Sequence, residues 1–142
     1  MKTKILITLL FIFSLFASIS CSENDCDSTA VEFRNVQVNL LVTNNSGYDL
    51  SLKIDATKHY CSGKTNGVYD THRQVSSSHS ILVPYYFKFD NLKDEITFEI
   101  EAIDSNDHNH TTIVTGSFTY EKVGDNTVYQ FPLNINVSDF NK

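Results

Sequence analysis

Two histidines in the second half of the chain are of the type and spacing that bind metal ions. His108 and His110 lie two residues apart within the polar segment 104–110, and Asp107 stands beside them. Imidazole and carboxylate groups are common ligands of divalent ions. Two histidines are too few for a structural zinc site, and the segment lacks the closing Glu of an EF-hand. Because Asp, Asn and Ser also favour turns, we interpret 104–110 as a polar turn, with His108, His110 and Asp107 as the alternative metal ligands.

A second group of reactive side chains lies between residues 57 and 80. It contains His59, His72 and His79, together with Cys61 and the serine run 76–78. A Cys–His or Ser–His pair could perform nucleophilic catalysis. The chain has no Gly-x-Ser-x-Gly elbow, and Cys61 is expected to be used in a disulfide. We therefore predict no catalytic residue and interpret this segment as an irregular polar region with one short strand, at 68–75.

Tyrosines are the remaining candidates for ligand contact. Tyr60, Tyr69 and Tyr86 could stack on a sugar or a peptide, because an aromatic ring offers an apolar face with a polar tip. Tyr86 falls in the outward phase of its expected strand, whereas Tyr85 falls in the inward phase and is expected in the core. The alternative role of Tyr86 is support of a cross-strand neighbour.

Apolar residues alternate with polar ones along most of the chain after residue 30, a pattern that predicts β-strands. The expected strands are 31–42, 50–56, 81–89, 96–102, 114–120 and 129–137, with a bulge near residues 34–35. The turn at 44–47 predicts a hairpin between the first two strands. Pro84 lacks an N–H to donate, which places its strand at a sheet edge.

Six or seven strands without an amphipathic helix predict an all-β fold. We expect an antiparallel β-sandwich of immunoglobulin-like kind for residues 31–142, with a small barrel or a transthyretin-like sandwich as the alternatives. The chain has no Trp, so only the architecture is predicted and not the immunoglobulin family itself.

The first twenty residues have the order of an export signal. Two lysines, Lys2 and Lys4, precede the apolar stretch 5–19, which is shorter than the roughly 20 residues that a membrane-spanning helix needs. The stretch ends in Ser18-Ile19-Ser20-Cys21. This ending resembles the lipobox of bacterial lipoproteins, although Ser stands at position 18, where that family usually has Leu. The resemblance implies diacylglycerol on the Cys21 thiol and cleavage before it, so that 1–20 is removed. The alternative is a plain secretory signal.

The segment after Cys21 is polar and acidic. The residues Ser22-Glu23-Asn24-Asp25 resemble the export tag of surface lipoproteins in the Bacteroidota, and Asp27-Ser28-Thr29 resembles the O-glycosylation signal of that phylum. The resemblance implies an outer-membrane lipoprotein, possible exposure at the cell surface, and Ser28 as a glycan acceptor. We interpret 21–30 as a tether between the lipid and the domain.

Two further cysteines, Cys26 and Cys61, would then reside in an oxidising compartment. The expected hairpin turns at residues 44–47, so its two open ends, near residues 30 and 61, would lie side by side. We therefore predict a Cys26–Cys61 disulfide, with two free thiols as the alternative.

The charge balance narrows the choice of partners. Removal of 1–20 leaves nine basic and seventeen acidic residues, a net charge of −8. A surface this acidic repels nucleic acid. Contact with the membrane is expected through the N-terminal lipid and not through surface charge. We expect no cofactor and a non-enzymatic binding or structural module, whose ligand is a protein or a glycan. The alternatives are a metal-dependent or hydrolytic accessory enzyme and an acidic inhibitor of a basic secreted protein.

Overall fold

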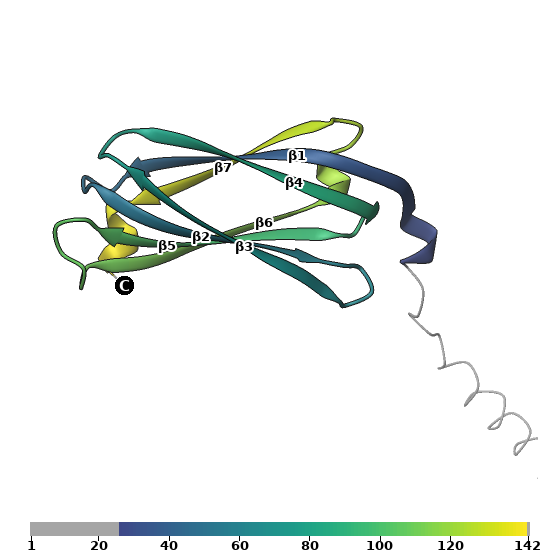
Figure 1. Cartoon of the computed structure of the whole chain (residues 1–142), viewed down its shortest axis with the longest axis horizontal. Coiled ribbons are helices and arrows are strands. Elements are labelled where there is room, and N and C mark those ends of the chain that lie inside the picture. Colours follow the sequence, from purple (N-terminus) through teal and green to yellow (C-terminus); the bar gives the residue numbers. More distant parts are fainter. Residues whose placement is uncertain (1–25, 142) are drawn as a thin grey trace, which may run out of the picture.

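The computed structural model describes residues 26–141, apart from the side chains of Ser28, Val68, Tyr69 and Asn141. Within this range the chain forms strands joined by turns and by short 3₁₀ segments (Figure 1). In chain order the elements are η1 (Asp27–Thr29), β1 (Ala30–Asn45), β2 (Leu50–His59), β3 (Thr65–Val75), β4 (Ser80–Asn91), β5 (Glu95–Asp104), β6 (Thr111–Thr119), η2 (Tyr120–Lys122), β7 (Val128–Asn136) and η3 (Val137–Asn141).

The strands form two sheets that pack face to face, which confirms the predicted β-sandwich. One sheet has the order β4-β1-β7 and the other β3-β2-β5-β6. The β1–β4, β2–β5 and β5–β6 pairs are antiparallel, in the arrangement of strands B–E and C–F–G of immunoglobulin domains. The last strand, β7, lies beside β1 where the first strand of that fold would be. The β1–β7 pair is parallel, so the sheets are not antiparallel throughout as expected.

The predicted hairpin between the first two strands is wrong. After Asn45 the chain crosses to the other sheet, so β1 and β2 face each other across the core instead of pairing. The buried side chain of Asn44 shapes this crossing. Its amide donates to the carbonyls of Tyr48 (2.7 Å) and Val75 (3.2 Å), and its oxygen accepts from the N–H (3.0 Å) and the hydroxyl (2.6 Å) of Ser46.

The predicted disulfide nevertheless forms between Cys26 and Cys61. Their Cα atoms are 5.7 Å apart. The bond joins the segment before β1 to the segment after β2, because strands in facing sheets end at the same end of the sandwich. The pairing of these two cysteines was therefore predicted correctly from an incorrect premise about strand pairing.

Residues 57–80 are more regular than expected. The strand β2 extends to His59, and β3 is an eleven-residue edge strand in place of the short one expected at 68–75.

Two other predictions are confirmed. Pro84 lies in the edge strand β4, and the register of β1 against β4 shifts between Ala30 and Arg34.

Inward-facing apolar side chains of both sheets fill the space between them. The aromatic rings of the core interlock, as in the stacked pairs Phe89–Tyr120 (4.5 Å between centroids) and Phe98–Phe131 (5.7 Å). Where β6 passes over β7, Gly116 leaves room for the Phe131 ring, which a Cβ atom would approach to 3.1 Å. The space between the sheets is thus closely packed with apolar side chains.

Candidate functional site

A buried lysine lies at one end of the sandwich. Along β2 the residues Leu50, Leu52, Ile54 and Ala56 face the core, and Lys58 follows in the same phase. Its side chain is only 7% exposed. The ammonium group donates to the backbone carbonyl of Lys88 on β4 (2.5 Å) and lies over the rings of Tyr60 (4.0 Å) and Phe89 (5.3 Å). Lys58 therefore links the two sheets across their open edge.

Two carboxyl groups complete this cluster, which we call the Lys58 cluster (Lys58, Asp90 and Asp94). The Lys58 Nζ lies 3.0 Å from Oδ2 of Asp94 and 3.9 Å from Oδ1 of Asp90. The 1% exposed side chain of Asp94 also accepts the N–H groups of Cys61 (3.1 Å) and Asp90 (3.3 Å). These contacts fix the turn between β4 and β5 against the end of β2.

The two carboxyl groups have opposite pKa shifts. A hydrogen bond between the side chains of Asp90 and Asp94, followed by burial, raises the pKa of Asp90. Burial opposes ionisation of Asp94, but hydrogen bonds from Asp90, from the Cys61 amide and from Lys58 outweigh it and lower the pKa of Asp94. Asp90 is therefore the more readily protonated member of the pair.

A groove opens beside this cluster, between the edge strand β4 and the loop after β2. Its volume is about 430 Å³, and it is lined by Asn35, Lys58, Tyr60, Asn66, Tyr86, Phe87 and Lys88. Tyr86 is 68% exposed. The side-chain amide of Asn66 donates a hydrogen bond to the hydroxyl of Tyr60 (3.2 Å). The structure thus brings together two of the three tyrosines singled out in the sequence. The side chain of Tyr69 lies outside the described part of the structure.

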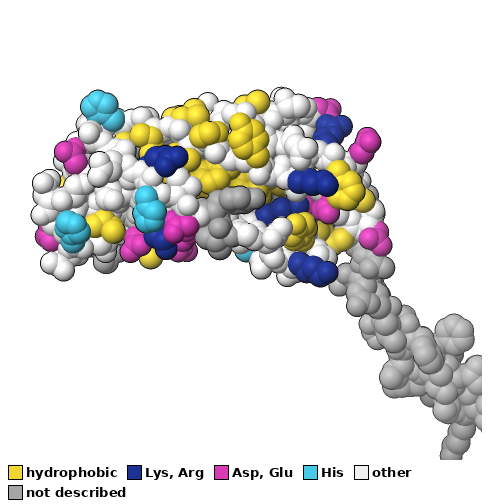
Figure 2. All heavy atoms as spheres, in the orientation of Figure 1, with side chains coloured by type: hydrophobic (Ala, Val, Ile, Leu, Met, Phe, Trp, Pro, Cys, Tyr) yellow, Lys and Arg dark blue, Asp and Glu magenta, His cyan; other side chains and the backbone are white. Residues whose placement is uncertain are grey.

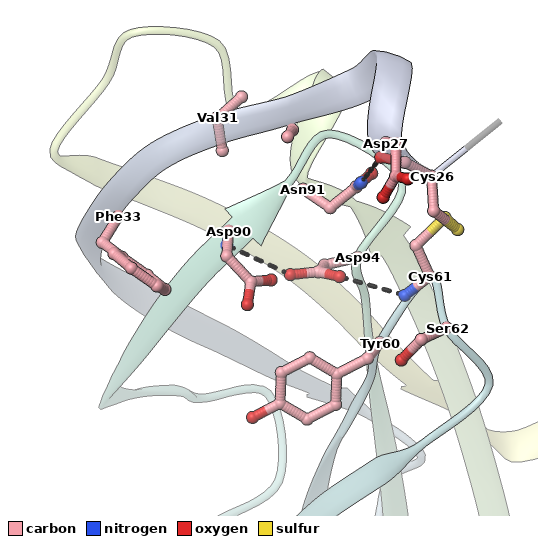
Figure 3. A pocket seen from close by; sticks show the side chains of 11 residues that line it. Cys26, Asp27, Val31, Phe33, Tyr60, Cys61, Ser62, Asp90, Asn91 and Asp94 are labelled. Atoms are coloured by element: carbon pink, nitrogen blue, oxygen red, sulfur yellow. Dashed lines mark hydrogen bonds between the residues drawn. A yellow bond between two sulfur atoms is a disulfide. The ribbon is translucent and has the colours of Figure 1, made fainter. Parts of the chain in front are cut away.

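A second hollow of about 370 Å³ shares Tyr60 with the groove. In Figure 3 the rings of Tyr60 and Phe33 flank its opening, and the carboxyl group of Asp90 points between them. Phe33 is 66% exposed, and the Lys88 ammonium lies over its ring at 4.2 Å. The two hollows meet at Tyr60, near the end of the sandwich that carries the disulfide; Lys58 and Lys88 line the first, whereas Asp27, Asp90 and Asp94 line the second.

The outer faces of the two sheets differ in charge. Across the three-stranded sheet, β4, β1 and β7 present three successive rows with no charged residue, Leu82-Leu41-Pro132, Pro84-Asn39-Gln130 and Tyr86-Gln37-Val128. Across the four-stranded sheet, Asp70, Asp55 and Glu99 form one row and His72, Lys53 and Glu101 the next. Figure 2 shows hydrophobic side chains along the upper, three-stranded side and acidic ones gathered with lysine and histidine below.

The residues weighed as metal ligands are not brought together as a metal site. Asp107 accepts the N–H of Asn109 (3.1 Å), which is the turn geometry expected of this loop. His110 packs against Tyr48 and Phe140 (both 4.7 Å between centroids), whereas His108 is exposed. Among residues 26–141 no three His, Cys, Asp or Glu side chains are grouped so that they could hold a metal ion.

Other candidates fall partly outside the described residues. Cys21 and the apolar stretch 5–19 are not described, nor is the side chain of Ser28. In the part of the chain that is described, no helix has the length and apolar character to cross a membrane. Cys61 is bonded to Cys26 and so does not serve as a nucleophile for His59, His72 or His79.

Sequence reasoning missed the Lys58 cluster. The available signal was the phase of β2, which places residue 58 inward, and the turn 90–94, which carries two aspartates four residues apart. A lysine is rarely fully buried without a partner, so the phase alone does not predict burial of Lys58.

Comparison with known proteins adds no relative from which a role could be transferred. No protein-family model, no curated protein and no solved structure matches the chain significantly. The site is therefore defined by its own geometry: a groove lined by Tyr60, Tyr86 and Lys88, beside a buried Lys58 cluster.

Proposed function

We propose that the protein is a lipid-anchored binding module of the cell envelope, which holds an acidic glycan in the groove beside β4. The single observation that supports it best is the convergence of Tyr60, Tyr86 and Lys88 on that groove. Tyr86 and Lys88 lie on β4, whereas Tyr60 follows β2, so the fold brings two distant parts of the chain together at the groove.

The composition of the groove suits a saccharide that carries carboxylates. Tyrosine rings can pack against the apolar face of a sugar ring, and the exposed amides of Asn35 and Asn66 can bond its hydroxyl groups. Lys88 offers a positive charge on a domain that is acidic overall. A neutral glycan would not use this charge, so we infer that the ligand is anionic.

The lipid would place this groove close to the membrane. Cys26 lies five positions after Cys21, and a chain of this length reaches at most about 17 Å. Cys26 itself lines the hollow that adjoins the groove. A ligand within the cell envelope is therefore easier to reach than one far from it.

The anchor is tested by metabolic labelling. In a bacterium that processes lipoproteins, labelled palmitate should enter the wild-type chain and be absent from the Cys21→Ser variant. The disulfide between Cys26 and Cys61 should remain in both, as a control for folding. A wild-type chain without label, or an amino terminus other than residue 21, would exclude the anchor.

Binding is tested by calorimetric titration with a uronic-acid oligosaccharide and with its neutral counterpart. We expect the acidic probe alone to bind, and Tyr86→Ala to weaken binding by about tenfold, equivalent to about 1.4 kcal/mol. Lys88→Ala should weaken it similarly and reduce its dependence on salt. Lys122→Ala, an exposed lysine outside the groove, is the matched control. Equal effects of Lys88→Ala and Lys122→Ala, or no binding of either probe, would contradict the assignment.

The acidic row Asp70-Asp55-Glu99 on the four-stranded sheet, with Glu101 in the next row, supports a second candidate, an inhibitor that binds a basic secreted protein. In that case Glu99→Gln and Glu101→Gln would weaken salt-sensitive capture of a basic protein such as lysozyme, whereas Tyr86→Ala would not.

A further inference from the structure

Lys58 and Asp94 are not needed to explain ligand binding, and their burial is costly. Two charges removed from water recover little net stability from each other, and hydrophobic residues of the same volume often serve as well. The pair nevertheless occupies the junction between the end of β2 and the turn after β4, where Nζ and Oδ2 are 3.0 Å apart. A primary amine in contact with a buried carboxyl group is also a pair that can react.

We propose that Lys58 and Asp94 form an internal amide cross-link, in which Nζ of Lys58 bonds to Cγ of Asp94 and one water is lost. In this step a C–N bond forms and one C–O bond of the carboxyl group breaks. The ammonium group gives up two protons, which leave with the carboxyl oxygen as water. The net charge of the protein does not change, and no oxidant or other reactant is needed.

The surroundings hold the amine in place for attack. Nζ is fixed by the Lys88 carbonyl at 2.5 Å and lies over the Tyr60 ring at 4.0 Å. Fixing two reacting groups in contact replaces a collision between separate molecules, and for well-oriented groups the effective concentration reaches about 10⁵ M or more. The two N–H groups on the Asp94 carboxyl, from Cys61 and Asp90, would stabilise the negative charge that develops on oxygen during attack.

Asp90 is placed to move the protons. Its Oδ1 lies 3.9 Å from Nζ, and its backbone N–H donates to Oδ2 of Asp94 (3.3 Å). Because the neighbouring Asp94 carboxyl and burial raise the pKa of Asp90, it can act as an acid toward the departing hydroxyl. Asp90, the more readily protonated carboxyl, first passes its proton to Asp94 and takes one from the ammonium, which leaves a neutral amine beside a neutral Asp94. Asp90 then protonates the leaving oxygen and recovers a proton from the new amide nitrogen.

The bond would supplement the disulfide. Cys61 lies three residues after Lys58, and its N–H already contacts Asp94. Reduction of the disulfide frees the segment before β1, but an amide between residues 58 and 94 would keep the end of β2 joined to the turn before β5.

Peptide mapping of the purified full chain tests the proposal. After reduction, trypsin cleaves at Lys53, Lys64, Lys93 and Lys122 but not at a lysine held in an amide. We expect peptides 54–64 and 94–122 as one linked species, lighter than their sum by one water. Complete cleavage at Lys58, with no linked species, would overturn the proposal.

Two variants examine the roles of the residues. Lys58→Met should abolish the linked species and give an intact mass that matches its composition once the disulfide is counted. Asp90→Asn keeps the Lys58–Asp94 contact and should slow linkage by at least about 100-fold, the lower end of the range for loss of acid–base catalysis. Retention of the Cys26–Cys61 disulfide and of the far-UV spectrum shows that each variant is folded. Linkage of Asp90→Asn at the wild-type rate would refute the role of Asp90.

Discussion

Removal of the disulfide is the perturbation whose effect follows most directly from the structure. Cys26 and Cys61 are 35 residues apart in sequence. In the chain-entropy account a cross-link that closes a loop of this length contributes about 4 kcal/mol, because it restricts the unfolded chain. The double variant Cys26→Ser, Cys61→Ser should therefore lower the free energy of unfolding by about this amount.

The folded state is expected to keep its geometry in this variant. The carbonyl of Cys26 accepts the N–H of Thr29 at 3.3 Å and the side-chain amide of Asn91, and the Cys61 N–H bonds Asp94. None of these contacts uses sulfur. The loss of stability should thus come from the gain of freedom in the unfolded chain, which also exposes more surface.

Urea unfolding at neutral pH measures both effects. The midpoint should fall, and the dependence of the free energy on urea should stay equal or increase. Reduced wild-type protein should unfold like the double variant, whereas reductant should leave the variant unchanged. A loss below about 1 kcal/mol would refute the reasoning, since the expected range is roughly 2–5 kcal/mol for a small exported domain.

Three further predictions concern the core and the Lys58 cluster. Phe98→Ala should lower the free energy of unfolding in urea by about 3–5 kcal/mol, because it empties a fully buried ring site. The control Ile113→Ala, at a residue that is 61% exposed, should lower it by less than about 0.5 kcal/mol. Gly116→Ala should cost about 1–3 kcal/mol, since its Cβ would lie 3.1 Å from the Phe131 ring; unchanged stability would show that the ring yields. In freshly folded protein, before the proposed amide forms, stability should fall as pH drops through the lowered pKa of Asp94, because a carboxyl with a depressed folded pKa stabilises only when ionised. Asp94→Asn should flatten that part of the profile, and an equally steep profile in the variant would assign the effect to other carboxyl groups.

The raised pKa of Asp90 has the opposite effect on the pH dependence of stability. Its pKa is raised in the folded protein, so its contribution is present below the unfolded pKa and is lost as the pH rises through the folded value. Replacing Asp90 by Asn should therefore remove a small penalty at neutral pH, unlike the replacement of Asp94.

Alternation of side chains let the sequence predict much of the sandwich. The inward phase of Val36, Val38, Leu40 and Val42 is observed, as are the exposed Tyr86 and the buried Tyr85. These features were accessible because the side-chain period of a strand is local and needs no knowledge of its partner. The edge position of Pro84 was accessible for the same reason, since the missing N–H belongs to the residue itself.

Strand partners were not accessible in this way. The turn after β1 has the composition of a hairpin turn, yet it carries the chain to the facing sheet. The last strand, β7, pairs in parallel with the first strand, β1, and not with a strand next to it in sequence. Partner choice depends on which faces bury the most apolar surface together, and the alternation of a single strand does not contain that information.

The sequence by itself determined which residues of most strands face the core, and it predicted the pairing of Cys26 with Cys61. Only the tertiary structure decided that the end of β2, the edge of β4 and the turn 90–94 meet at one end of the sandwich. That meeting buries Lys58 against Asp94 and brings Tyr60 to Tyr86. The physical reason is that such contacts join residues about 30 positions apart in sequence, and only the packing of two sheets fixes their distance.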